Sequence, residues 1–169
     1  MKTFNAIVFL CGLASAVAWA QAPGQVVKAK VTVAPGEARP DSIVRAAVEV
    51  EVLPGYHIND HRPTLDYLIP TEVKLEPIKE VTGNNIIYPK GELKKFAFSD
   101  APLSVYEGTV RVDIALQLDH KTPPGDYEVK GKLAYQACND HACLPPASVP
   151  IAFSFKVASA GARTKRSNP

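Results

Sequence analysis

Two cysteines, Cys138 and Cys143, stand five positions apart near the C-terminal end of the chain, with His141 between them. Thiols at this spacing can form a structural disulfide, exchange a disulfide with another protein, or join the imidazole in binding a soft metal ion, copper(I) or zinc. A structural bond here would close a loop of about six residues, for which chain entropy predicts roughly 2 kcal/mol of stabilisation. A loop this short is a poor staple, and this favours disulfide exchange.

The metal alternative needs a fourth ligand in addition to the two thiols and His141. His57 and His61 could provide it only if the fold brings them close, and taken alone they read as ordinary surface or loop-packing residues. The chain has no Ser-His-Asp arrangement, no paired-carboxylate motif and no glycine-rich phosphate loop, which argues against classical hydrolase chemistry. Because the fourth metal ligand is unassigned and no motif indicates a cofactor, we predict neither a metal nor a cofactor.

The residues that precede the cysteines alternate in polarity. Odd positions up to Tyr135 are apolar and even positions are mostly polar, so Cys138 falls on the outward set of the strand. The Asn-Asp pair that follows is typical of a turn and can bring Cys143 back toward Cys138. Two prolines just after Cys143 keep that stretch out of a central ladder. The pattern predicts a solvent-exposed pair of neighbouring sulfurs in a short loop near a sheet edge.

Long runs of alternating apolar and polar residues make up most of the chain. Such alternation places one face of a β-strand on a core and the other face in water. The clearest runs are 27–33, 45–52, 110–119, 127–135 and 151–157, and shorter candidates are 72–75, 86–88 and 93–98. Pro/Gly turns separate the runs, and no segment has a convincing helical stripe. We predict an all-β fold, an immunoglobulin-like antiparallel two-sheet sandwich, with a barrel as the alternative.

The first twenty residues have the features of a secretory signal peptide. Lys2 precedes an apolar stretch that ends in the small-x-small sequence Ala18-Trp19-Ala20. Cys11 lies too early in that stretch to indicate a lipoprotein. We predict that residues 1–20 are cleaved on export to the periplasm and that residues 21–157 form one domain. No later stretch is apolar over enough residues to span a bilayer, so no membrane insertion is expected after cleavage.

The composition is that of an ordinary globular protein, with 169 residues of which 46% are hydrophobic and 21% charged. The formal net charge of +2 comes from the two ends of the chain. The end segments hold Lys2, Arg163, Lys165 and Arg166, which leaves 15 basic residues against 17 acidic ones in the body. No basic patch indicates nucleic-acid binding. Residues 158–169 are expected to form a disordered basic tail.

Three stretches resemble the N-terminal periplasmic domain of the thiol:disulfide interchange protein DsbD. They are Tyr135-Gln136-x-Cys138 followed by Cys143-x-Pro145-Pro146 and Val149-Pro150-Ile151; Pro54-Gly55-Tyr56-His57-Ile58-Asn59; and the segment from Phe96 to Val112. The likeness extends over roughly residues 25–157. The cysteine stretch is specific, whereas the other two stretches are weak alone and useful together.

The resemblance implies a domain whose cysteine pair alternates between dithiol and disulfide. It assigns the intermolecular mixed disulfide to Cys143 and the resolving step to Cys138. It also implies an aromatic cap that shields the pair, for which Phe96 and Phe98 are both candidates. Family members place side chains beside the pair at two further positions, here occupied by His57 and Asn59, and His141 could favour a thiolate if it were protonated.

The resemblance also implies partners. In that family a thioredoxin-like domain, fed by a membrane-embedded segment, supplies electrons that the N-terminal domain passes on to other periplasmic proteins. This sequence carries neither the membrane segment nor the thioredoxin-like domain, so we expect thioredoxin-like redox partners and a separate membrane thiol reductase. The predicted function is that of a thiol–disulfide oxidoreductase component in a periplasmic electron relay. The alternative is a non-enzymatic immunoglobulin-like binding or adaptor domain with a fixed disulfide.

Overall fold

A computed structural model describes residues 25–159, and every regular element within that range is a β-strand. The strands are β1 (Val27–Val33), β2 (Ile43–Val52), β3 (His57–Asn59), β4 (Glu72–Leu75), β5 (Val81–Ile87), β6 (Glu92–Lys94), β7 (Leu103–Tyr106), β8 (Thr109–Leu118), β9 (Gly125–Tyr135), β10 (Ala137–Cys138) and β11 (Ala147–Val157). The described part of the chain contains no helix able to cross a membrane. The predicted signal peptide and nearly all of the predicted tail lie outside the described residues.

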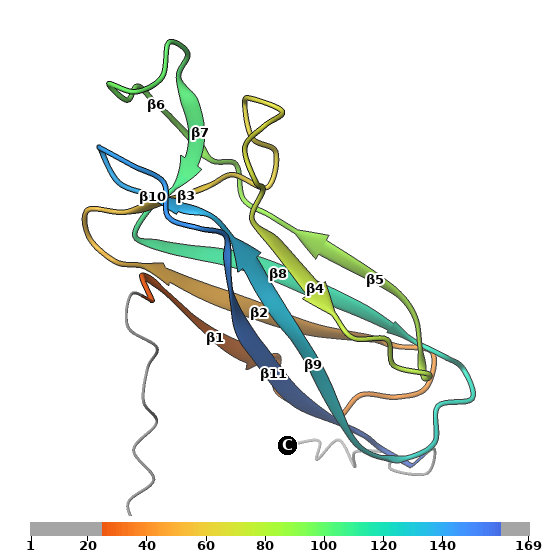
Figure 1. Cartoon of the computed structure of the whole chain (residues 1–169). Helices are drawn as coiled ribbons and strands as arrows, with labels where there is room; N and C mark the ends of the chain where they lie inside the picture. The colour runs from red at the N-terminus through yellow and green to blue at the C-terminus, as the bar shows by residue number, and fades with distance from the viewer. Residues whose placement is uncertain (1–24, 160–169) are drawn as a thin grey trace, which may run out of the picture.

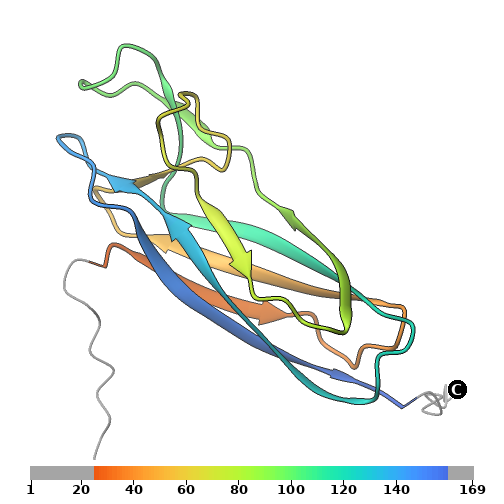
Figure 2. The same cartoon turned by 45° about the vertical axis from the view of Figure 1, so that its right-hand side comes forward.

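Two antiparallel sheets form the body of the molecule, one with strand order β1-β2-β8-β5 and one with order β11-β9-β4 (Figure 1). They lie face to face as two layers, which the rotated view in Figure 2 also shows. The long alternating runs of the sequence form β1, β2, β8, β9 and β11. Each of these strands has one apolar face, and a second sheet is needed to cover that face. The predicted immunoglobulin-like sandwich is confirmed.

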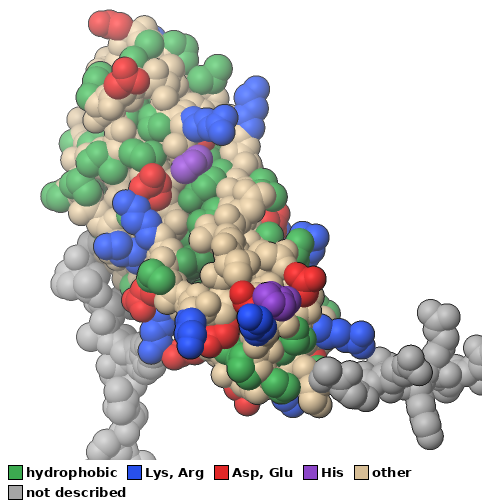
Figure 3. Space-filling view, turned by 90° about the vertical axis from the view of Figure 1, so that its right-hand side faces the viewer, with side chains coloured by type: hydrophobic (Ala, Val, Ile, Leu, Met, Phe, Trp, Pro, Cys, Tyr) green, Lys and Arg blue, Asp and Glu red, His purple; other side chains and the backbone are tan. Residues whose placement is uncertain are grey.

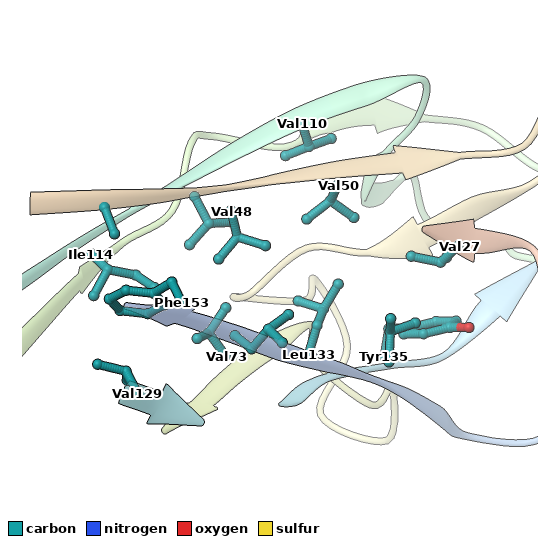
Figure 4. Packing of buried hydrophobic residues seen from close by; sticks show 14 of the residues in the cluster. Val27, Val48, Val50, Val73, Val110, Ile114, Val129, Leu133, Tyr135 and Phe153 are labelled. Carbon is teal, nitrogen blue, oxygen red and sulfur yellow. The ribbon is translucent and has the colours of Figure 1, made fainter. Parts of the chain in front are cut away.

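The main core fills the space between these two layers (Figure 4). Val48 and Ile114 project from β2 and β8, and Leu133 and Phe153 project toward them from β9 and β11. Leu133 and Val48 are fully buried, and all four side chains belong to one continuous apolar cluster. Full burial of a side chain of this size contributes about 1.5–3 kcal/mol.

A third, smaller antiparallel sheet with order β10-β3-β7-β6 lies at one end of the sandwich, at the top of Figure 1. The alternation did not predict β3 or β7, and it placed Cys138 on the strand that ends at Tyr135, whereas Ala137 and Cys138 form the separate strand β10. The predicted strand 93–98 was wrong beyond Lys94, where the chain leaves β6 for a loop. One face of the small sheet, with Ile58, Tyr106 and Ala137, belongs to the main core. The other face carries the cysteine site.

Candidate functional site

Cys138 and Cys143 are joined by a disulfide across a tight hairpin, with Cα atoms 3.9 Å apart. Asn139 builds the turn: its side-chain oxygen accepts hydrogen bonds from the backbone N–H groups of His141 (2.9 Å) and Ala142 (2.8 Å). Its own N–H donates to the carbonyl of Ala142 at 2.9 Å. The predicted turn, with two neighbouring sulfurs at a sheet edge, is therefore confirmed, since β10 is an edge strand of the small sheet.

The prediction that Cys138 is exposed to solvent was wrong, because its side chain is only 2% exposed. Its direction was right: Ala137 belongs to the main core, and Cys138, as the next residue along the strand, faces away from that core. The outward face of the small sheet is covered by residues distant in sequence, and that cover buries the cysteine. Cys143, five positions later, lies in the exposed part of the hairpin. The two cysteine residues joined by one bond thus differ in their exposure to solvent.

His57 and Phe96 cover this outward face. The register of β10 against β3 pairs Cys138 directly with His57, so both side chains lie on the same side of the sheet. The imidazole of His57 stacks on Phe96 with ring centroids 4.2 Å apart, and Phe96 stacks on Phe98 at 5.3 Å. Phe96 is 8% exposed and Phe98 is 44% exposed. Of the two candidate cap residues, Phe96 is therefore the inner one and Phe98 the outer one.

Phe96 belongs to a second, small apolar cluster that is separate from the main core. Its buried members are Phe96, Leu103 and Val105, and Leu65 and Leu68 pack against them from the loop after β3. We call this group the cap cluster. It fixes the loop between β6 and β7 over the outer face of the small sheet, which is where the sequence places the candidate cap.

His57 is only 2% exposed, and its Nε2 atom has no hydrogen-bond partner among the residues that the structure describes. Burial lowers the pKa of His57, because a desolvated imidazolium is unfavourable. The charges of Glu107 and Asp140 act in the opposite direction, and Lys94 adds to the lowering. The imidazole is therefore favoured in its neutral form.

Asn59 lies on the same face of β3 as His57 and is fully buried. Its amide nitrogen donates to the carbonyl of Ile69 at 2.9 Å, whereas its side-chain oxygen has no partner within residues 25–159. His141 lies in the exposed hairpin between the cysteines. His61 is not brought to the pair: it stacks on Tyr88 with ring centroids 3.7 Å apart.

Asp60 anchors a hydrogen-bond network that the sequence did not reveal. Its carboxylate accepts bonds from the hydroxyls of Tyr106 (2.6 Å) and Ser104 (2.7 Å) and from the backbone N–H groups of Gly91 (3.1 Å) and Arg62 (3.2 Å). Glycine is required at position 91, because a Cβ atom there would come within 2.6 Å of the side-chain oxygens of Asp60 and Ser104. The network ties the end of β3 to β7 and to the turn before β6. No local pattern marks Asp60, because its side-chain donors lie more than forty positions away in sequence.

The pKa of Asp60 reflects two opposed effects. Burial acts to raise it, but the hydrogen bonds from Ser104, Tyr106, Arg62 and Gly91 stabilise the carboxylate and leave the pKa below its ordinary value. Burial, together with the bond to the anionic Asp60, raises the pKa of the Tyr106 hydroxyl well above its ordinary value. Asp60 is therefore a carboxylate that structural hydrogen bonds already occupy.

Within residues 25–159, no group of three or more His, Cys, Asp or Glu side chains is arranged to hold a metal ion.

The exposed apolar side chains are unevenly distributed over the described part of the molecule. Of the six large hydrophobic side chains that are exposed in the described residues, four lie in the small sheet or in the loops beside it: Tyr67, Ile69, Leu93 and Phe98. Figure 3 shows one side of the molecule, on which hydrophobic side chains gather toward this end.

Comparison with known proteins gives a family match over most of the chain. The model for the family described as "Thiol:disulfide interchange protein DsbD, N-terminal" matches residues 22–154. No protein with a curated description matches the sequence. The match includes both cysteines and every strand up to the middle of β11.

Solved structures give a likeness in fold. The N-terminal periplasmic domain of ScsB from Proteus mirabilis superposes with a TM-score of 0.53 at 14% identity, over 81% of this chain and 48% of that one. This chain thus corresponds to about half the length of the ScsB chain. The DsbD N-terminal domain of Neisseria meningitidis in its reduced form has a TM-score of 0.39 at 20% identity, over 70% of this chain and 85% of that one. In its complex with the PilB N-terminal domain the values are 0.44 and 20%, over 79% and 84%.

Proposed function

The chain belongs to the family of DsbD N-terminal domains, the thiol:disulfide interchange family, and from this premise we propose that it relays electrons through Cys138 and Cys143. The observation that carries the proposal is the unequal exposure of the two cysteine residues, with Cys143 exposed and Cys138 2% exposed. Exchange with a second protein needs one sulfur that the partner can reach and a second that closes the bond afterwards. A purely structural disulfide has no need of this asymmetry.

The proposed reaction starts from the dithiol form. The Cys143 thiolate attacks a disulfide of the partner, forms a mixed disulfide and releases one partner thiolate. The Cys138 thiolate then attacks the Cys143 sulfur, which forms the Cys138–Cys143 bond and releases the second partner thiolate. Two electrons pass to the partner, the protons that the two thiols carried go to solvent and the partner, and the domain is left in the disulfide state seen here.

The cap cluster supports a protective role for Phe96. The ring is buried and stacks on His57, which is the cross-strand neighbour of Cys138. We assign the inner cap to Phe96, with Phe98 as its outer, half-exposed cover. This arrangement leaves Cys143 as the sulfur through which a partner would react.

The partners that we propose are thioredoxin-like redox proteins, with a separate membrane thiol reductase as the source of electrons and the periplasm as the compartment. The exposed apolar side chains around the small sheet support docking of a protein at this end. A thioredoxin-fold partner would cover the hairpin that carries Cys143 and the neighbouring half-exposed Phe98.

A trapping experiment tests the relay. In Cys138→Ser the exposed Cys143 should form a mixed disulfide with an oxidised thioredoxin-like protein. Because the Cys138 thiol that would resolve this bond is absent, a covalent complex should accumulate and appear on non-reducing gels. The matched variant Cys143→Ser keeps only the buried cysteine and should give little or no complex. Equal trapping by both variants, or trapping by neither, would contradict the proposal.

The reduction potential separates this proposal from a fixed structural bond in a binding domain. Known exchangers have potentials of about −120 to −270 mV, whereas structural disulfides of exported proteins typically lie below about −300 mV. Equilibration of the wild-type domain with glutathione or dithiothreitol buffers gives the value directly. A potential below about −300 mV would favour the binding or adaptor domain.

A further inference from the structure

The buried ring of His57 has a nitrogen that no hydrogen bond satisfies. Nε2 has no partner among the described residues, although the side chain is 2% exposed. Phe96 stacks on the ring, and the register of β3 against β10 sets the ring beside the Cys138 side chain. A buried polar atom without a partner costs free energy, so its retention in this position needs an explanation.

Reduction of the disulfide would place a hydrogen-bond donor in the same region. Cys138 carries no proton in the disulfide state, whereas in the dithiol state its sulfur carries an S–H group. Directly opposed residues of an antiparallel pair have Cβ atoms about 4.5–5.5 Å apart on one face of the sheet. From Cβ atoms at this separation, the side chains of Cys138 and His57 are long enough for the thiol to reach the imidazole.

Cys138 has a greater need of a base than Cys143. Burial in apolar surroundings raises the pKa of a thiol, and only the thiolate is a nucleophile. Cys143, in the exposed hairpin, can lose its proton to water, but Cys138 is enclosed by the small sheet and the residues that cover it. The mixed disulfide cannot be resolved until Cys138 is deprotonated.

We propose that His57 takes the proton of the Cys138 thiol through Nε2 and thereby forms the thiolate that resolves the mixed disulfide. This inference rests on the proposed function and concerns its second step. The burial that lowers the pKa of His57 keeps the ring neutral and able to accept a proton near neutral pH. The charged groups that act on the ring are Glu107 and Asp140, which would stabilise the imidazolium, and Lys94, which would oppose it.

The proton moves from the Cys138 sulfur to Nε2, and the thiolate that this forms attacks the Cys143 sulfur with its electron pair. The bond between Cys143 and the partner sulfur breaks, and the partner leaves as a thiolate with the bonding pair. The imidazolium then loses its proton to water, which returns Nε2 to the unpaired state of the disulfide form.

The two steps can be timed separately in the reduced domain with dithionitrobenzoate, an aromatic disulfide whose released thiolate is coloured. A stoichiometric amount reacts first with Cys143 and releases one coloured thiolate, and closure by Cys138 then releases the second. The first phase reports the exposed cysteine, and the second phase reports the step assigned to His57. Stopped-flow absorbance over a range of pH gives both rates.

In the wild type the second-phase rate should be nearly constant above neutral pH, because the neutral imidazole is already present. His57→Phe keeps a ring for the stack on Phe96 and removes the nitrogen. Its second phase should be about a hundredfold slower near pH 7, as expected for loss of a general base, and should rise with pH. His57→Gln retains polarity without basicity and should behave like His57→Phe. In both variants the first phase should stay within about twofold of the wild type, since the exposed Cys143 does not use this base.

The matched control is His120→Phe, which removes an exposed imidazole from the turn between β8 and β9, at the other end of the sandwich. It should leave both phases unchanged. A second phase with wild-type rate and pH dependence in either His57 variant, if that variant is folded by circular dichroism, would overturn the proposal. Equal slowing of both phases would also overturn it, since that indicates a general effect on the hairpin. If the wild type itself gives no second phase, the relay fails as a whole.

Discussion

The domain contains two apolar clusters that differ in what they enclose. The main core lies between the two large sheets and consists of side chains such as Leu133 and Val48. The cap cluster has only Phe96, Leu103 and Val105 as buried apolar members. It lies on the face of the small sheet that carries the polar His57 and Asn59, both buried.

The difference separates stability from reactivity. Burial of apolar surface is the main favourable contribution to folding, and most of that surface lies in the main core. Buried polar groups with open hydrogen-bonding capacity cost free energy, and within residues 25–159 the two such side chains, His57 and Asn59, lie beside the cap cluster. A sandwich whose main core excludes both cysteines can tolerate the opening of the bond between them. The comparison predicts that substitutions in the two regions affect different measurements.

Leu133→Ala should have the largest effect on stability. Leu133 is fully buried where β9 faces the opposite sheet, and truncation of such a leucine costs about 3 kcal/mol through lost burial and the cavity that remains. Urea denaturation measures the loss. Leu93→Ala makes the same change at a residue that is 67% exposed and should cost less than about 0.5 kcal/mol.

The redox side of the same comparison follows from the location of Leu133, outside the small sheet. The reduction potential of the folded Leu133→Ala domain should remain within about 15 mV of the wild type, since about 30 mV corresponds to 1.4 kcal/mol for this two-electron couple. A large shift in potential would show that the main core and the disulfide are energetically coupled, which would contradict the separation of stability from reactivity.

Asp60→Asn should have the next largest effect, roughly 2 kcal/mol at neutral pH, because hydrogen bonds to a charged acceptor contribute more than neutral ones. The pKa of Asp60 in the folded state lies below its ordinary value of 3.8, since the bonds from Ser104, Tyr106 and two backbone N–H groups outweigh the effect of burial. A lowered folded-state pKa gives stability that is present above the unfolded-state pKa and is lost as pH falls through the folded-state value. The difference between variant and wild type should therefore shrink below about pH 4.

Urea denaturation at neutral pH and near pH 3 measures this change. Asp66→Asn is the matched control, because Asp66 is exposed and has no part in the network; it should change stability by less than about 0.5 kcal/mol. A cost for Asp60→Asn that is the same at both pH values would show that the bonds act through geometry alone and that the carboxylate charge contributes nothing.

The same contrast explains how much the sequence could predict. Strands such as β8 and β11 have ten or eleven residues, long enough for alternation to identify them and their buried face. β3 has three residues and β10 has two, which is too short for any period to appear. The sandwich was therefore predictable and the small sheet was not.

Cys138 shows what a local pattern contains and what it omits. Alternation gave the direction of its side chain correctly, since Ala137 belongs to the main core and Cys138 faces away from it. Its burial depends on neighbours such as His57 and Phe96, which lie some forty to eighty residues earlier in the chain. The hydrogen bonds of Asp60 with Ser104 and Tyr106 likewise join residues more than forty positions apart in sequence. The cover over the cysteine pair is thus assembled from long-range contacts. Local residues predicted the pair and its turn, and a likeness to a family was the sequence signal for the cover.

Phe96→Ala gives the smallest of these effects and tests the cap directly. Removal of the ring should uncover the face that carries Cys138, so that a small thiol can reach its sulfur and water can solvate the thiolate that leaves. We expect reduction of the disulfide by dithiothreitol to be about tenfold faster, which corresponds to about 1.4 kcal/mol in the activation barrier.

Phe98→Ala is the control: it removes the outer ring, which is already 44% exposed, and should change the rate of reduction by less than about twofold. Equal acceleration in both variants would mean that the stack acts as one unit. An unchanged rate in Phe96→Ala would mean that the exposed Cys143 alone sets the rate of attack, and that the cap cluster shapes the hairpin without shielding it.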